Sequence, residues 1–152
     1  MRFTSFTTVL ALVASTSAVP ASMFNTRQAT TLNAAMVAHG RSYIGTSLTI
    51  RNDNTEQNLI RGAEFGSITP ENAMKWDATE PNRGQFNFGQ ADQIANFAQQ
   101  NNKQLRCHTL VWYSQLPGWV SSINNNATLI SVMENHIKTL MTRYKGEYPR
   151  SL

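Results

Sequence analysis

Apolar residues recur every three to four positions in four parts of the chain, the spacing of a helix with one buried face. The clearest pattern predicts a helix over 129–144, and a similar one predicts a helix over 89–101. Two shorter helices are predicted over 32–39, where a threonine can cap the first turn, and over 56–62. Helices of this kind need a partner layer for their apolar faces.

Short apolar runs between these helices predict strands over 43–47, 65–68 and 104–111. Proline and glycine mark loops after the second and third runs, at 80–84 and 116–119. Strands that alternate with helices indicate parallel βαβ units with helices covering the sheet. The pattern therefore predicts an α/β fold, either an open doubly wound sheet or part of a closed barrel, which typically needs about 250 residues when complete.

The first residues have the features of a secretory signal peptide. Arg2 precedes a short apolar run over 9–14, and small residues follow, so cleavage after Ala18 or after Ala21 fits equally well. The apolar run is shorter than the roughly 20 residues that a membrane span needs. We therefore expect a signal peptide over 1–18, a short propeptide over 19–27, and a secreted protein without a membrane segment.

Charge and cysteine content exclude several classes of function. The formal net charge is +4, but two arginines lie in the leader, so the mature part carries about +2. Its basic residues are scattered, which argues against nucleic-acid binding. Cys107 is the only cysteine, which excludes an intramolecular disulfide and a zinc site built from cysteines. Its apolar surroundings predict that the thiol is buried.

One cluster of chemically active residues follows the second predicted strand. Glu71, Asn72 and Lys75 stand beside an aromatic residue, Trp76. Acceptors and donors for vicinal hydroxyls, together with a flat apolar surface, suit a sugar ring. The other interpretation is a solvated helix start, with the carboxylate near the positive end of the helix dipole.

A second cluster follows the third predicted strand, where His108, Trp112 and Gln115 could line a pocket. The alternatives are a core histidine and tryptophans, including Trp119, that serve ordinary packing. Neither cluster has the spacing of a metal site, a glycine-rich phosphate loop or a serine nucleophile on a sharp turn. No metal or cofactor is therefore expected.

Three motifs in order resemble the substrate-binding signature of the secreted fungal endo-1,4-β-xylanases of glycoside hydrolase family 10. They are Glu71-Asn72-x-x-Lys75-Trp76, then Glu80-Pro81-x-Arg83-Gly84-x-Phe86, then His108-Thr-Leu-Val-Trp112-x-Ser-Gln115. The resemblance covers 32–146. It implies a TIM (β/α)8 barrel, of which 28–152 would be the N-terminal, incomplete part with about three βα units.

The resemblance also implies residue roles. It implies that Glu71, Asn72 and Lys75 bind xylose hydroxyls on the non-reducing side of the cleaved bond. His108 and Trp112 would position the sugar whose bond is cut, with assistance from Gln115. Tyr113 stands where the family more often has histidine, so we expect altered contacts there. Separately, Asn126-Ala127-Thr128 is a candidate glycosylation sequon.

The implied reaction is hydrolysis of internal β-1,4 bonds of xylan with retention, which requires two carboxyl groups. In the family, the acid/base follows a Trp-Asp-x-x-Asn-Glu stretch on the fourth strand, and the nucleophile lies on the seventh. The chain reads Glu147 to Leu152 at the corresponding place. We therefore expect that both catalytic glutamates are missing, that Glu71, Glu80 and Glu134 do not replace them, and that this chain is inactive as written.

Two alternatives to an enzyme remain open: a non-catalytic protein that binds xylan or xylo-oligosaccharides, and a partner that completes a barrel with another chain. A completed barrel is expected to be a monomer. Three strands of such a barrel would leave an exposed edge and an uncovered apolar interior. We predict that the isolated mature chain aggregates or is partly unfolded; a cooperative thermal transition with sharp near-UV dichroism would contradict this.

Overall fold

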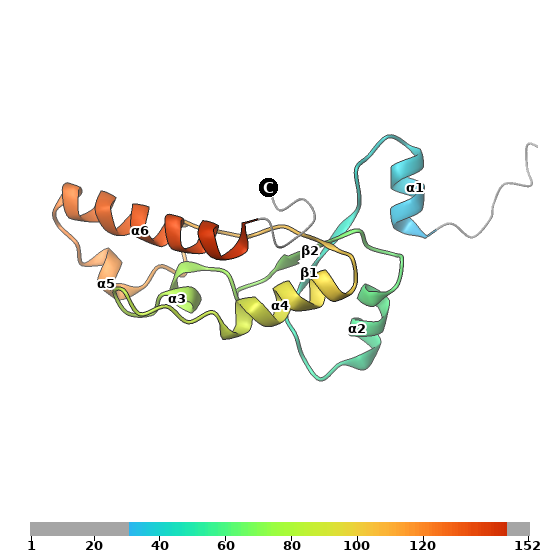
Figure 1. Ribbon diagram of the computed structural model, residues 1–152, viewed down its shortest axis with the longest axis horizontal. Helices are drawn as coiled ribbons and strands as arrows, with labels where there is room; N and C mark the ends of the chain where they lie inside the picture. The colour runs from blue at the N-terminus through green and yellow to red at the C-terminus, as the bar shows by residue number, and fades with distance from the viewer. Residues whose placement is uncertain (1–30, 146–152) are drawn as a thin grey trace, which may run out of the picture.

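The computed structural model describes residues 31–145. The predicted signal peptide, the predicted propeptide and the segment from 146 onward lie outside the described residues. The elements follow one another in the order shown in Figure 1: α1 (Leu32–Ala38), β1 (Gly45–Leu48), α2 (Asn54–Arg61), β2 (Ser67–Pro70), α3 (Trp76–Thr79), α4 (Gly89–Gln100), β3 (Gln104–Leu105), α5 (Gly118–Ser121) and α6 (Asn126–Tyr144).

The three strands form one parallel sheet in the order β1-β2-β3. In the register, Gly45 lies opposite Ser67, and Ser67 lies opposite Gln104. Each parallel connection passes through a helix, as parallel strands require. The alternation of strand, helix and strand predicted from the sequence is confirmed.

The third strand is much shorter than predicted. The apolar pattern predicted a strand over 104–111, whereas β3 contains only Gln104 and Leu105. The ladder with β2 continues as far as the hydrogen bond from Arg106 N to Ile68 O, at 2.8 Å. The next bond would need a backbone N–H at Pro70, which proline does not have. The chain therefore leaves the sheet, and the residues after it form a loop.

Side-chain caps account for where α2 and α6 begin. Asp53 accepts hydrogen bonds from the backbone N–H groups of Thr55 and Glu56 at the start of α2. Asn125 accepts one from Thr128 N at 2.9 Å, so α6 begins three residues before the predicted start. Two short helices, α3 and α5, were not predicted, and α5 begins in the segment expected to be a loop.

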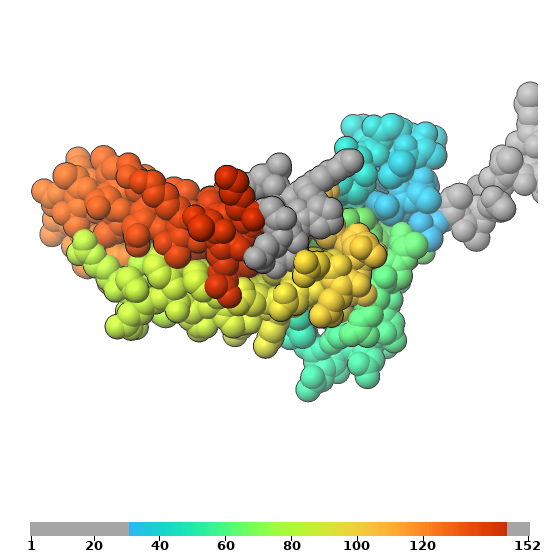
Figure 2. Space-filling view, in the orientation of Figure 1, coloured from blue at the N-terminus to red at the C-terminus, as the bar shows by residue number. Residues whose placement is uncertain are grey.

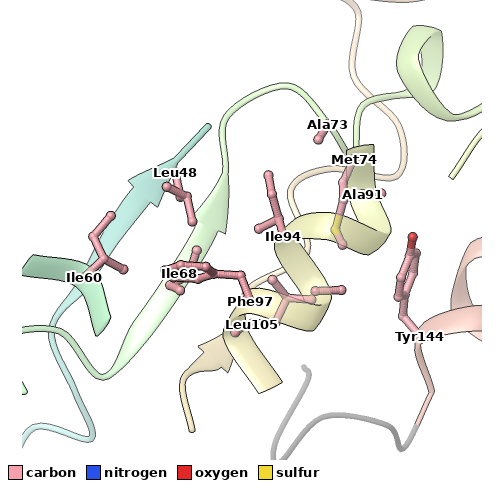
Figure 3. Close-up of a cluster of buried hydrophobic side chains, with 12 residues drawn as sticks. Leu48, Ile60, Ile68, Ala73, Met74, Ala91, Ile94, Phe97, Leu105 and Tyr144 are labelled. Atoms are coloured by element: carbon pink, nitrogen blue, oxygen red, sulfur yellow. The ribbon is translucent and has the colours of Figure 1, made fainter. Parts of the chain in front are cut away.

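The core lies between the sheet and the helices that cover it. Leu48, Ile68 and Leu105, one from each strand, are fully buried. Helix α4 contacts β2 and β3, and its Ile94 and Phe97 point toward the strands in Figure 3. The predicted apolar face of this helix is confirmed. Burial of such side chains is the main stabilising contribution to the fold.

Helix α6 is held against α4 by polar contacts. Asp92 of α4 accepts hydrogen bonds from Arg143 Nε and from the hydroxyl of Tyr144, both at 2.9 Å. The guanidinium of Arg143 also lies 4.5 Å from the ring centroid of Phe88. The molecule is elongated, with α5 and α6 at one end and α1 and α2 at the other (Figures 1 and 2).

Within residues 31–145, β1 and β3 each pair on one side only. No helix of the described part is long and apolar enough to cross a membrane. Cys107 is only partly buried and packs against the core, so the prediction of a buried thiol holds in part. Burial raises the pKa of this thiol, which disfavours the reactive thiolate.

Candidate functional site

Two loops at the same edge of the sheet carry the six residues predicted to bind substrate. Glu71 directly follows β2, and its backbone N–H donates to Leu48 O of β1 at 3.2 Å. His108 is the third residue after β3. The sequence predicted that His108 lies within a strand and that Trp112 lies at its end. The structure places both residues in a loop, because β3 ends at Leu105.

Lys75 joins the two loops and is almost completely buried, with 8% of its surface exposed. Its Nζ donates to Asn72 Oδ1 at 2.9 Å and, more closely, to Gln115 Oε1. The same Nζ lies 4.7 Å from the ring centroid of Trp112. Gln115 Nε2 also donates to Asn72 Oδ1, at 2.9 Å. The structure therefore brings four of the six predicted residues into one contact network.

Gln115 has a backbone conformation that supports its place in this network. Its φ of +53° lies in the left-handed region that non-glycine residues seldom adopt. Its carbonyl accepts a hydrogen bond from Asp77 N of α3 at 3.2 Å, so its backbone contacts α3 while its side chain contacts the other loop. Strained residues held by their surroundings are concentrated at functional sites.

Two further aromatic side chains of the second loop, those of His108 and Tyr113, lie next to Trp112. The ring centroids of His108 and Trp112 are 6.3 Å apart, and those of Trp112 and Tyr113 are 5.4 Å apart. Trp112 is 37% exposed and Tyr113 is 87% exposed. The pKa of His108 is lowered by burial and by the positive charges of Arg106 and Lys75. A neutral imidazole beside an exposed indole can donate to or accept from a sugar hydroxyl.

Glu71 lies in a separate set of contacts on the β1 side, with no hydrogen bond in the described structure to the Lys75 network. Its Oε2 accepts hydrogen bonds from Thr49 Oγ1 at 2.6 Å and from a terminal nitrogen of Arg51 at 3.0 Å. Its Oε1 has only a long contact of 3.4 Å from Ser47 Oγ. The hydrogen bond from Thr49, followed by the charge of Arg51, lowers the pKa of Glu71 against the opposing effect of burial.

Ser47, Thr49 and Arg51, which contact Glu71, were not among the predicted site residues. Their signal was an alternation: polar residues at 47, 49 and 51 are separated by Leu48, which is fully buried, and by Ile50, which packs against the core. Successive side chains of an extended segment point to opposite sides. The pattern therefore contained a polar side directed at the residue that follows the next strand.

The carboxyl group of Glu80 is buried, with the residue only 1% exposed. Its Oε2 accepts from Trp76 Nε1 at 3.0 Å and lies 2.9 Å from Nδ1 of His136 on α6. Its Oε1 accepts from Gly84 N at 2.8 Å. The sequence motif around Glu80 was predicted to have no catalytic role, and these contacts give it a structural one: it anchors the loop that carries Lys75 to α6.

The imidazole of His136 is fully buried and stacks on Trp76, with ring centroids 4.2 Å apart. Nδ1 faces the carboxyl oxygen, which is an acceptor, so the proton of the neutral ring is on Nδ1. Nε2 is buried without a hydrogen-bond partner among residues 31–145. Burial lowers the pKa of His136, while the hydrogen bond and the charge of Glu80 and, more weakly, the backbone of Leu110 oppose this shift.

This lowered pKa predicts an acid-sensitive fold. The unfolded histidine takes up its proton near its ordinary pKa of about 6.5, before the buried ring does. The contribution of the neutral His136 to the free energy of unfolding is therefore fully present above about pH 6.5 and is lost as the pH falls further. In a complete barrel that contains residues 31–145, we expect the urea unfolding midpoint to fall between pH 7.5 and pH 5. The His136→Gln variant, whose amide keeps a donor but does not titrate, should reduce that fall.

His39→Gln serves as the matched control, because His39 is exposed at the C-terminal cap of α1. This variant should keep the full pH dependence. Equal pH dependence of the original protein and the His136→Gln variant would show that His136 does not cause the acid sensitivity.

Two further features complete the candidate site. Asn126 is exposed at the first position of α6, rather than in a loop, and its glycosylation stays a prediction. Within the described residues, no group of three or more His, Cys, Asp or Glu side chains could hold a metal ion. The residues of the two loops offer an ammonium, amides, a carboxylate and an exposed indole, a combination that can bind the hydroxyls and the apolar face of a sugar.

Sequence comparisons agree with this chemistry. Residues 31–150 match the profile of glycosyl hydrolase family 10. The chain is 67% identical over 129 residues to endo-1,4-β-xylanase B of Humicola insolens, covering 84% of this chain and 35% of that protein. It is 52% identical over 153 residues to endo-1,4-β-xylanase 2 of Aureobasidium pullulans, covering 97% of this chain and 42% of that protein. The chain thus spans about two fifths or less of the length of these relatives.

Solved structures give the same result for the fold. Xylanase 10B from Thermotoga petrophila RKU-1 in complex with xylobiose superposes with a TM-score of 0.71 at 34% identity, over 78% of this chain and 38% of that chain. A family 10 xylanase from Bispora sp. MEY-1 with xylobiose has the same TM-score, identity and coverage. These neighbours confirm that the described residues form part of a TIM barrel. The motifs, the fold and the profile match together show that the chain belongs to glycosyl hydrolase family 10.

Proposed function

We propose that residues 31–145 form the sugar-binding side of a secreted endo-1,4-β-xylanase that hydrolyses internal β-1,4 bonds of xylan with retention. The observation that supports this most directly is the network centred on the buried Lys75, which joins two loops at one edge of the sheet. Its amides and ammonium, with Glu71 nearby, would bind xylose hydroxyls, and the exposed face of Trp112 would support the sugar next to the cleaved bond.

The bond-breaking carboxyl pair is proposed to lie outside residues 31–145. A retaining glycosidase needs two carboxyl groups about 5–5.5 Å apart. Glu71 is engaged by Thr49 and Arg51, and Glu80 is buried and hydrogen-bonded to three donors. Neither carboxyl group has the freedom that an acid/base or a nucleophile needs.

Binding of xylo-oligosaccharides without hydrolysis is the second candidate function. It is supported by the fact that Asn72, Lys75, Trp112 and Gln115 are in contact within this part of the chain alone. A saturable change of tryptophan fluorescence when the 152-residue chain is titrated with xylotetraose would favour it. The Trp112→Phe variant is the control, since Trp112 is the exposed indole of the site.

The enzymatic proposal is tested with a chimera in which residues 31–145 replace the matching segment of the Humicola insolens relative. We expect the chimera to release xylo-oligosaccharides from β-1,4-xylan, with a rapid fall in viscosity because cleavage is internal. Carboxymethylcellulose is the control substrate. A chimera that unfolds cooperatively on heating yet neither cleaves xylan nor binds xylotriose would refute the proposed function.

A further inference from the structure

Glu71 is held by side chains from the segment that follows β1, and not by its own loop. Thr49 Oγ1 donates to Oε2 at 2.6 Å, and the guanidinium of Arg51 donates to the same oxygen at 3.0 Å. Both bonds are charge-assisted, the stronger class of hydrogen bond. The carboxylate of Glu71 therefore cannot rotate without breaking two contacts at once.

The two carboxylate oxygens are in different environments. Oε2 receives both strong contacts, whereas Oε1 has only the 3.4 Å contact from Ser47 Oγ, which is too long to be a strong hydrogen bond between oxygens. Oε1 thus retains capacity to accept a hydrogen bond from a ligand. The side chain of Glu71 is 35% exposed, so a ligand can reach it.

The backbone explains why these residues act together. Leu48 and Ile50 point into the core, which directs Ser47, Thr49 and Arg51 to the opposite side. The pairing of β1 with β2 places Leu48 opposite Pro70, directly before Glu71. The register of the sheet therefore brings the polar side of one segment against the carboxylate that follows the neighbouring strand.

We propose that Thr49 and Arg51 are positioning residues that orient Glu71 so that its Oε1 accepts a hydrogen bond from a xylose hydroxyl one sugar beyond the unit whose bond is cut. This inference rests on the proposed function. It implies that Thr49 and Arg51 contribute to the preference for substrates that place a sugar at Glu71 over substrates that do not. Neither residue touches the reacting atoms.

The test compares two substrates on the chimera described above. If the proposal is correct, the second sugar of 4-nitrophenyl β-xylobioside contacts Glu71, whereas 4-nitrophenyl β-xyloside has no second sugar to make this contact. Thr49→Val removes the hydroxyl at nearly constant volume. We expect it to lower kcat/KM for the xylobioside about tenfold, mainly through a higher KM. The value of kcat/KM for the xyloside should change by no more than about twofold. Thr49→Ser, which keeps the hydroxyl, should restore most of the loss.

Arg51→Met gives an independent test, because the Arg51 side chain is 56% exposed and its loss does not threaten folding. Arg51→Met should lower kcat/KM for the xylobioside about threefold, as expected for the loss of one exposed charged contact. Arg61→Met, at an exposed arginine at the end of α2, is the matched control and should change kcat/KM for neither substrate.

Three outcomes would overturn the inference. A Thr49→Val variant that loses activity equally on both substrates would show a general structural role. A Thr49→Val variant without any effect, beside a Glu71→Gln variant that loses activity on the xylobioside alone, would refute positioning while leaving the proposed role of Glu71 intact. If Glu71→Gln has no effect on either substrate of an active chimera, both the binding role and the positioning are wrong.

Discussion

Replacing Glu80 with alanine is expected to lower the free energy of unfolding of the chimera by about 3–5 kcal/mol, because three hydrogen-bond donors lose their acceptor. The change removes the acceptor for Trp76 Nε1, His136 Nδ1 and Gly84 N at once. Each buried donor without a partner destabilises the fold by about 1–3 kcal/mol. The measurement is urea unfolding at pH 7.5, followed by tryptophan fluorescence.

Glu134→Ala is the matched control for this prediction. Glu134 lies on the exposed side of α6, and its side chain is 56% exposed beside Lys138. Exposed ion pairs of this kind contribute about 0–1 kcal/mol. A loss of less than about 1 kcal/mol in Glu80→Ala, comparable with the control, would show that the buried contacts do not anchor the loop.

Replacing Lys75 with methionine is expected to weaken binding of xylotriose about 100-fold, or about 2.7 kcal/mol. Methionine keeps the length and the apolar stem but removes the charge that contacts Asn72, Gln115 and the ring of Trp112. Hydrogen bonds to a charged group contribute about 1.5–3 kcal/mol each, and the two amides lose their common donor. Isothermal titration gives the affinity; it uses a form of the chimera in which the two catalytic carboxyl groups are replaced by amides, so that xylotriose is bound but not cleaved.

Lys138→Met is the matched control, because Lys138 is on α6 with its side chain 76% exposed. It should leave the affinity unchanged. Lys75→Arg should not rescue binding, since the planar guanidinium does not fit a buried ammonium position that is 8% exposed. Unchanged xylotriose affinity in a folded Lys75→Met variant would remove Lys75 from the site and with it the main support for the proposed function.

The local elements were largely predictable, because their causes are local. The threonine cap of α1 and the apolar spacing of α4 depend on residues within one or two turns. The end of β3 was not predictable in this way. It depends on Pro70 of the neighbouring strand, whose missing N–H ends a ladder that the apolar run 104–111 would otherwise have continued.

The candidate site was also predictable in part. Each of the two clusters is continuous in sequence, so the residue types were enough to suggest sugar binding, and three motifs in order indicated the family by resemblance. The spacing in the sequence did not predict which members of the two clusters are in contact. Lys75 and Gln115 meet across 40 positions because parallel strands bring their carboxyl ends to one edge. Glu71, the first residue of its cluster, instead turns toward Thr49 and Arg51.

The sequence by itself determined the class of fold, through its periodicity, and the chemical character of the two loops, through their residue types. The resemblance of three motifs indicated the family. Only the tertiary structure decided that Glu80 is a buried anchor, that Lys75 joins the loops, and that Thr49 and Arg51 hold Glu71. The physical reason is that burial and long-range hydrogen bonds depend on the register of the sheet and the packing of α6, and no local pattern contains either.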